Sequence, residues 1–328
     1  MKRIIFAICT ILCANVLFAQ EQLATLKHND SISVYYGANA FVQAYTDATH
    51  GDIITLSDGI FYAPQYVKKG ITVRGNGAYA DTTRHSTGTY FTQGFDLFDL
   101  GDSLQFSAEG IYFNEFDGGG SCNIKLNKCY VGGIRRAYGL QATNCIITIQ
   151  DYVSSYSHSN IYINCILKSY NSFLPHSYST CYNCIMIGKE NHSAPSNPSY
   201  DPYQYNNCII IKDSTSTDVI LDYPVNNSVL IGFTGTSSPA SSGNVVMSLS
   251  DVFENWDGES FPTDLETYVL KSSVSNSILG LDGSEVGIFG GVIPFDWTPT
   301  YSVIKILDVP NTPDENGMLN IDVEFLTE

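Results

Sequence analysis

The chain has 328 residues, of which 44% are hydrophobic and 15% are charged, so it can bury a sizeable core and is not expected to be disordered. It carries 33 Asp and Glu against 16 Lys and Arg, a net charge of −17. Such a surface repels a phosphate backbone and argues against a nucleic-acid partner. The 22 Tyr and 17 Phe beside only 4 Met favour strands over long helices. We therefore expect an all-β protein.

Residues 1–19 have the pattern of a secretory signal peptide. Two basic residues precede an apolar run from Ile4 to Phe18, and Ala19 supplies a small residue at the expected cleavage point. The run is shorter than the roughly 20 residues that a membrane-spanning helix needs. We therefore predict a protein that is periplasmic, secreted or on the cell surface after cleavage, and not integral to the membrane.

The start of the mature chain predicts a short helix followed by strands. Residues 38–48 place apolar side chains at helical spacing, and 52–56, 59–62 and 71–75 have the composition of short strands separated by glycine turns. A helix at this place would cover the open first turn of a repeat structure.

A short pattern, Asn-Cys-Ile followed by an apolar residue, recurs through the middle of the chain. The copies, including two in which Ser replaces Cys, begin at Asn144, Asn164, Asn183, Asn207, Asn227 and Asn276, at intervals of 20, 19, 24, 20 and 49 residues. One short apolar strand per repeat at this period predicts a β-solenoid. A leucine-rich repeat has the same period, but it needs several leucines per repeat, which are absent here.

These segments resemble the pectin-lyase-like right-handed parallel β-helix repeat proteins that Gram-negative bacteria secrete. The resemblance covers about residues 35–293, including the Asn-Cys-Ile repeats and a glycine-rich stretch at 282–291 that is similar to a closing turn. It implies an all-β fold, a single-stranded right-handed parallel β-helix with an N-terminal capping helix. Enzymes of this group are polysaccharide lyases or hydrolases that act in a groove on one sheet.

The sequence thus divides into three parts. We expect a signal peptide at 1–19, the β-helix domain at 20–293 and an acidic tail at 294–328. Within the tail, residues 301–309 and 318–326 alternate as strands do, with a turn between them, which predicts a hairpin.

The cysteines share one position in the repeat. Nine are present and two lie in the signal peptide, so the mature chain has an odd number that cannot all pair internally. Cys145, Cys165, Cys184 and Cys208 each stand two residues before an apolar residue, which predicts an inward stack of reduced thiols that act as small apolar filler. Disulfides between adjacent turns are the alternative. No ligand spacing predicts a metal, and no cofactor is expected.

If the cysteines point inward, the next residue of each repeat points outward. This places Ile146, Ile166, Ile185 and Ile209 in one apolar stripe, which is unusual for an uncovered surface. The stripe is covered either by this chain, through residues 191–205 or the tail, or by a protein partner or glycan.

Other candidate ligand-binding residues are tyrosines and arginines of the middle repeats. Tyr162, Tyr170 and Tyr182 could serve as stacking platforms for sugars, and Arg135 and Arg136 could supply positive charge. No paired-carboxylate motif is evident, so we assign no catalytic residue.

We therefore expect a secreted or cell-surface protein for recognition, adhesion or glycan binding, without established catalysis. The alternative is a polysaccharide lyase or glycoside hydrolase. A cluster of titratable groups on one outward face would favour the alternative.

Overall fold

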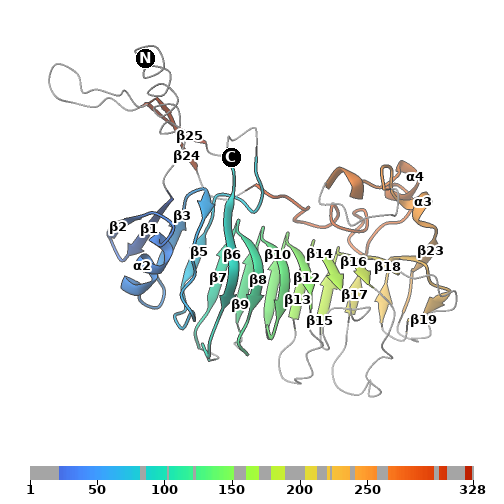
Figure 1. Ribbon diagram of the computed structural model, residues 1–328. Coiled ribbons are helices and arrows are strands. Elements are labelled where there is room, and N and C mark those ends of the chain that lie inside the picture. Colours follow the sequence, from blue (N-terminus) through green and yellow to red (C-terminus); the bar gives the residue numbers. More distant parts are fainter. Residues whose placement is uncertain are drawn as a thin grey trace, which may run out of the picture.

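The computed structural model describes residues 22–81, 86–101, 103–120, 123–150, 160–169, 179–188, 204–212, 220–221, 224–236, 241–256, 265–298, 303–308 and 322–326. In this part of the chain, successive turns add strands alternately to two sheets, here called sheet A and sheet B (Figure 1). The prediction of an all-β parallel solenoid is confirmed.

Sheet A has eleven strands within the described residues. From β3 onward, all neighbouring strands are parallel. In spatial order the strands are β2 (Ser31–Tyr36), β1 (Leu23–His28), β3 (Ile53–Leu56), β5 (Thr72–Arg74), β7 (Phe106–Glu109), β9 (Ile124–Asn127), β11 (Leu140–Thr143), β13 (Asn160–Ile163), β15 (Ser179–Tyr182), β17 (Gln204–Asn206) and β20 (Val225–Asn226).

Sheet B has ten strands in the same part of the chain, and all of its pairs are parallel. They are β4 (Gly59–Ile60), β6 (Thr89–Asp96), β8 (Tyr112–Asp117), β10 (Tyr130–Arg135), β12 (Ile146–Ile149), β14 (Ile166–Ser169), β16 (Ile185–Gly188), β18 (Ile209–Lys212), β21 (Val229–Ile231) and β23 (Val245–Met247).

The remaining elements are short. They are the helices α2 (Ala40–Asp47), α3 (Leu249–Val252) and α4 (Ser272–Ser275), the 3₁₀ turn η1 (Leu265–Tyr268), the parallel pair β19 (Ile220–Leu221) and β22 (Gly235–Thr236), and the antiparallel pair β24 (Val303–Asp308) and β25 (Asp322–Leu326). The last pair has the antiparallel pairing predicted for the tail.

The interior of the first turns is filled by phenylalanines. Phe41 of α2 lies at the end of this aromatic core, with its ring 5.0 Å from that of Phe91, while Phe95 lies 5.0 Å from Phe113 and 5.8 Å from Phe116. All five side chains are buried. The predicted capping helix is therefore present, and its apolar face covers the open end of the solenoid.

Later turns have a smaller core that includes a ladder of cysteines. Cys129, Cys145, Cys165, Cys184 and Cys208 occupy equivalent positions, and these five and Cys181 are buried and unpaired by disulfides. The reduced ladder is thus confirmed for the described cysteines, whereas Cys122 lies outside the described residues. Burial raises the pKa of the Cys145 and Cys184 thiols.

The asparagine of each repeat has a backbone role. Asn144, Asn164, Asn183, Asn207 and Asn227 each link a strand of sheet A to the next strand of sheet B, with φ between 46° and 58°. Asparagine tolerates this left-handed conformation better than most residues. In earlier turns, Lys128 and Gly110 take the same position with φ of 52° and 64°.

The parallel ladders end earlier than expected. The β-helix domain was predicted to continue to residue 293, but described residues 249–298 add no further strand to either sheet. They form a cover segment of short helices and turns that packs on the outer face of sheet B. Accordingly, Asn276 does not begin a repeat and lies at the end of α4.

Candidate functional site

The outward isoleucine stripe is buried by the cover segment. Ile146, Ile166, Ile185 and Ile209 lie in register on adjacent strands of sheet B, so their predicted outward orientation is confirmed. Their side chains are 6%, 2%, 0% and 0% exposed because they pack in a second core with Phe253, Tyr268, Val286 and Ile288, among other residues. The cover is intramolecular, and the described part of it lies within residues 249–298. The predicted tail contributes its first residues, of which Phe295 belongs to this core. Of the expected 191–205 excursion, residues 191–203 lie outside the described residues.

The end of the cover segment is fixed along the turns that contain the asparagines. The side-chain amide of Asn164 donates to the carbonyls of Ile288 and Gly290, both at 2.7 Å. The backbone N–H of Gly287 donates to the Asn207 carbonyl at 2.8 Å. One residue type therefore both forms the turn and holds the cover in place.

Lys128 anchors the last part of the cover segment. Its side chain is 7% exposed, and its Nζ lies 2.8 Å from Asp296 Oδ2 and also donates to the Thr298 carbonyl. Burial alone would raise the pKa of Asp296, but the hydrogen bonds from Lys128 and Thr298 outweigh it and lower that pKa. The carboxylate is thus ionised at neutral pH.

Tyrosines continue the isoleucine row where the cover segment ends. Tyr130 is the register partner of Ile146, and Tyr112 and Tyr90 follow on the next two strands. The Tyr112 and Tyr130 rings are stacked with centroids 4.8 Å apart, and Tyr90 lies 5.2 Å from Tyr112. All three are half-buried. We call Tyr90, Tyr112 and Tyr130 the tyrosine row.

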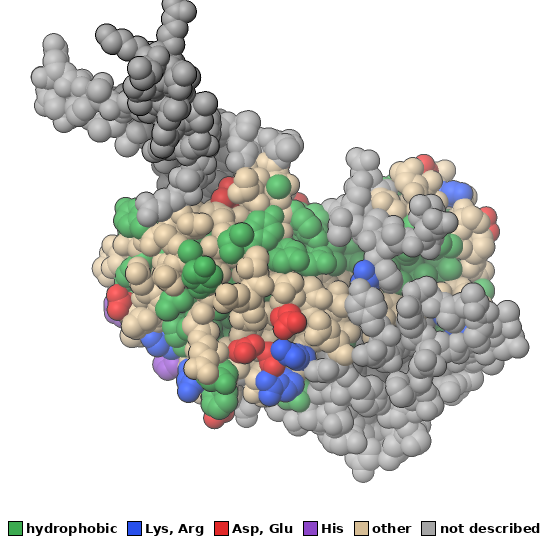
Figure 2. All heavy atoms as spheres, in the orientation of Figure 1, with side chains coloured by type: hydrophobic (Ala, Val, Ile, Leu, Met, Phe, Trp, Pro, Cys, Tyr) green, Lys and Arg blue, Asp and Glu red, His purple; other side chains and the backbone are tan. Residues whose placement is uncertain are grey.

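Two further rings extend the row toward the cover segment. Tyr79 lies 5.4 Å from Tyr130, and Trp297 lies 4.9 Å from Tyr79. Burial raises the pKa of Tyr79 and of Tyr90, so both hydroxyls stay protonated at neutral pH. The Tyr79 hydroxyl is itself buried and has no hydrogen-bond partner among the described residues. Figure 2 shows this face of the molecule, with an apolar band across it and acidic and basic side chains beside the band.

Beside the tyrosine row, at the positions that come next along the same strands, the residues are small or polar. Thr92, Gln93 and Asn114 are exposed. A Cβ atom at Gly132 would lie 2.6 Å from the Asn114 carbonyl oxygen, and one at Gly133 would lie 2.0 Å from Gln150 Nε2. Glycine is therefore required at 132, where a side chain would meet backbone, whereas at 133 the flexible Gln150 side chain would have to move.

Arg135 and Arg136 join a cluster of carboxylates at the ends of β6, β8 and β10. Asp117, only 4% exposed, accepts from Arg136 Nε at 2.9 Å and from the Gly119 N–H at 2.8 Å. Arg135 Nε lies 3.3 Å from Asp117 Oδ2. Because two guanidinium groups and a backbone donor surround Asp117, its carboxylate is charge-paired.

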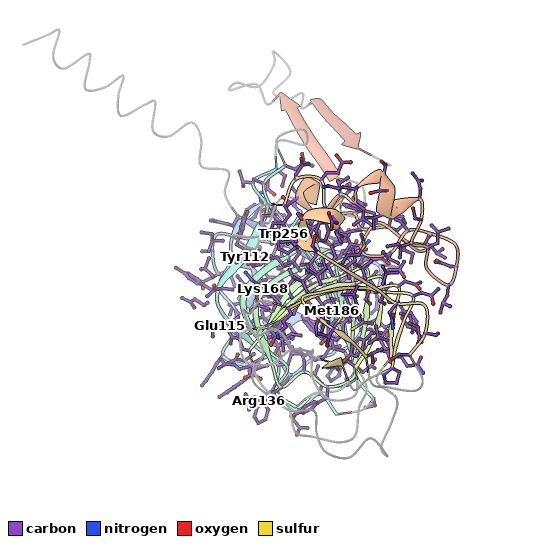
Figure 3. All side chains as sticks on the ribbon, turned by 90° about the vertical axis from the view of Figure 1, so that its right-hand side faces the viewer. Tyr112, Glu115, Arg136, Lys168, Met186 and Trp256 are labelled. Carbon is purple, nitrogen blue, oxygen red and sulfur yellow. The ribbon has the colours of Figure 1, made fainter. Side chains whose placement is uncertain are left out.

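Two other carboxylates border the same arginines. Glu115 Oε2 lies 3.4 Å from Arg135 Nη2, and its side chain is 46% exposed. Asp96 is the register partner of Asp117 on β6, and burial together with the Asp117 charge raises the pKa of Asp96. The cluster therefore holds one carboxyl group, that of Asp96, with a raised pKa. Figure 3 shows Tyr112, Glu115 and Arg136 on one side of the solenoid.

The predicted tyrosine platforms are not part of this face. Tyr162 is completely buried in the interior because its register partners, Ala142 and Cys181, face inward. Tyr182 is 39% exposed but belongs to sheet A, and Tyr170 lies outside the described residues. The structure brings together Arg135 and Arg136 but separates these tyrosines from them.

The tyrosine row was not predicted from the sequence, although the repeat that contains Tyr130 can be recognised there. Cys129-Tyr130-Val131 has the same spacing as Cys145-Ile146-Ile147, but Lys128 in place of asparagine concealed the repeat.

Among the described residues, no group of three or more His, Cys, Asp or Glu could hold a metal ion. In the same part of the chain, no helix has the length and apolar character to cross a membrane.

No family model matches this chain, and neither the search of curated proteins nor that of solved structures found a match.

Proposed function

We propose that the outer face of sheet B binds an extended, neutral saccharide chain outside the cytoplasm. The observation that carries the proposal is the run of three half-buried tyrosines in one outward row, between the isoleucines that the cover segment buries and the exposed Ile60 at the far end. If these three positions only had to be buried, aliphatic residues such as isoleucine would serve there. Tyrosine instead combines an apolar ring with a polar hydroxyl.

The spacing of the tyrosine row suits a polymer that runs along the solenoid axis. Ring centroids repeat at 4.8 and 5.2 Å, which is comparable to the length of one pyranose unit in an extended chain. Because the rings stack on each other, they present edges and hydroxyl groups, and the exposed Thr92, Gln93 and Asn114 add hydrogen-bonding partners for sugar hydroxyls.

The charge of the protein favours a neutral ligand. The net charge of −17 repels polyanions over most of the surface, and Arg135 and Arg136 are already paired with Asp117 and Glu115. We include in this proposal that the protein is exported and that it is related to the pectin-lyase-like proteins. Export is supported by the signal-peptide pattern of residues 1–19, and the relationship is supported by the parallel solenoid.

A glycan array followed by calorimetric titration tests this function. Tyr112→Ala should weaken binding at least tenfold, because it removes the central ring, while Tyr112→Phe should have a smaller effect because only the hydroxyl is lost. Tyr66→Ala is the matched control, since Tyr66 is 41% exposed and its ring contacts that of Phe98 at 5.1 Å, outside the row. Unchanged affinity in Tyr112→Ala, or no glycan bound by the wild type, contradicts the proposal.

The charged cluster supports glycoside hydrolysis as a second candidate. Asp96, which has a raised pKa, would donate a proton to the leaving oxygen, and half-exposed Glu115 would activate water. Glu115 lies opposite Gly94, two residues before Asp96 on the adjacent strand, so their Cα positions are roughly 8 Å apart by strand spacing and rise. An inverting mechanism needs roughly 6.5–9.5 Å between its two carboxyl groups.

Reducing-sugar release from the glycans bound in the array tests this second candidate. Asp96→Asn and Glu115→Gln should each abolish turnover while binding remains, and Glu254→Gln, an exposed acid of the cover segment, is the control. Activity should fall as pH rises through the raised pKa of Asp96, because the proton donor is lost. Turnover that persists in both variants excludes this assignment.

A further inference from the structure

Among the described strands, sheet A ends in β2, which has a neighbouring strand on one side only. β2 is first in the spatial order of the sheet, and β1 is its neighbour among the described strands. The Gly37 N–H donates to the Gln22 carbonyl across this pair. Because backbone groups alternate in direction along an antiparallel strand, the N–H and C=O groups of Ile32, Val34 and Tyr36 point to the free side.

The same three residues have exposed apolar side chains. Ile32, Val34 and Tyr36 are 69%, 44% and 58% exposed, and they share the outward face because Ala24 and Leu26 of β1 face the core. The strand, Ser-Ile-Ser-Val-Tyr-Tyr, contains no charge and no proline. Soluble proteins usually protect an edge strand with such residues, so this edge is suited to strand addition.

We propose that β2 pairs antiparallel with β2 of a second copy of this chain about a two-fold axis. The register that places Val34 opposite Val34 also places Ile32 opposite Tyr36. It therefore pairs all three free backbone positions and all three exposed side chains at once. Cross-strand contacts between aromatic and β-branched residues stabilise sheets, and sheet A then continues through both copies.

Charge complementarity supports a second copy as the occupant. In this register Asp30, immediately before β2 in one copy, lies at the end of the shared ladder, where the other copy turns at Gly37 toward α2. That helix has no side-chain hydrogen bond at its N-cap, Asn39, and no acidic residue in its first turn. A carboxylate at this end interacts favourably with the helix dipole, and the two-fold axis repeats the contact.

Sedimentation velocity of the mature chain over a range of concentrations tests the proposal. We expect a dimer that dissociates on dilution, and a monomer at every concentration for Val34→Lys, because the axis places two like charges opposite each other. The control Ile60→Lys changes an apolar residue of similar exposure, 49%, on sheet B and should remain dimeric. Thermal denaturation establishes that both variants are folded. A monomeric wild type, or a dimer that survives Val34→Lys, overturns the proposal.

Crosslinking tests the register independently. In Val34→Cys the two new thiols lie about 5.5 Å apart by Cα positions in a hydrogen-bonded pair, so a short thiol-reactive crosslinker should give a covalent dimer. In Ile32→Cys the thiols are separated by about 14 Å from the strand rise, and the yield should be at least tenfold lower. The unsubstituted chain controls for its native thiols. Equal yields from the two variants overturn this register.

Discussion

At the scale of single residues, Asn164 combines a left-handed backbone with hydrogen bonds to the cover segment. Asn164→Gly keeps the backbone conformation accessible but leaves the carbonyls of Ile288 and Gly290 without their donor. We expect a loss of about 1–3 kcal/mol in the free energy of unfolding. Asn164→Ala should lose about 1–2 kcal/mol more, because alanine is strained at this φ of 49°. Urea denaturation measures both values.

Asn227 provides the control for this pair of variants. It has a φ of 46°, but no described residue of the cover segment accepts a hydrogen bond from its side chain. Asn227→Gly should therefore change stability much less than Asn164→Gly. Equal losses at both positions would show that the turn, and not the cover segment, determines the effect.

At the scale of elements, the contact between sheet B and the cover segment can be tested with charge. Ile166 and Ile185 are 2% and 0% exposed under the cover, so the double variant Ile166→Asp, Ile185→Asp buries two unpaired carboxylates. We expect destabilisation by several kcal/mol and a large fall in melting temperature. Ile60→Asp, at the uncovered end of the same row and 49% exposed, should be nearly neutral. Similar melting temperatures for both proteins would contradict this packing.

The ion pair between Lys128 and Asp296 should make the attachment of the cover segment sensitive to acid. Because the folded pKa of Asp296 lies below its ordinary 3.8, its contribution is present above that value and is lost as pH falls through the folded pKa. The effect should be about 1 kcal/mol or less, since the Asp296 side chain is 45% exposed and screened.

Lys128→Asn isolates this ion pair, because asparagine occupies the same turn in later repeats. The difference in urea midpoint between wild type and Lys128→Asn should therefore narrow on going from neutral pH to strong acid. A difference that stays constant with pH would show that the Thr298 carbonyl contact, and not Asp296, is what Lys128 contributes.

At the scale of the whole molecule, the turns of the solenoid could be predicted from the sequence because inward and outward side chains alternate along each strand. Cys145 inward and Ile146 outward follow from one apolar pattern, and a slip by one residue would reverse both. The register of the ladder and the reduced cysteines could therefore be derived from spacing. The capping helix could also be predicted, because residues 38–48 have apolar side chains at helical spacing, and such a face can be buried against the open end of a solenoid.

The cover segment and the charged cluster could not be predicted in the same way. Residues 249–298 lack a repeat, and their contacts with Asn164 and Asn207 depend on tertiary structure. Asp96, Asp117 and Arg135 stand about 20 residues apart in sequence and meet only because successive turns stack. Tyr162 illustrates the opposite error: composition suggested a surface platform, but the inward register of sheet A buries its ring.

The cover segment also links turns that are distant in sequence. In a simple solenoid, each turn contacts only its neighbours, so stability is close to a sum of local terms and the ends can unfold separately. Here, residues 168 apart are joined by the Lys128–Asp296 contact and residues 74 apart by the Asn207–Leu281 contact. The cover therefore ties the later, smaller-cored turns to the phenylalanine-rich first turns.

We predict that weakening these contacts separates the unfolding of the two halves. In the double variant Lys128→Asn, Asn164→Gly, backbone amides of β16, β18 and β21 should exchange with solvent faster than in the wild type, while those of β6 and β8 keep their protection because their core of Phe91, Phe95 and Phe113 is unchanged. Native-state hydrogen exchange followed by mass spectrometry measures both sets of strands. Asn227→Gly, which leaves the cover segment attached, should not separate them. Uniform acceleration along the whole solenoid in the double variant would show that cooperativity comes from the stacked turns themselves and not from the cover segment.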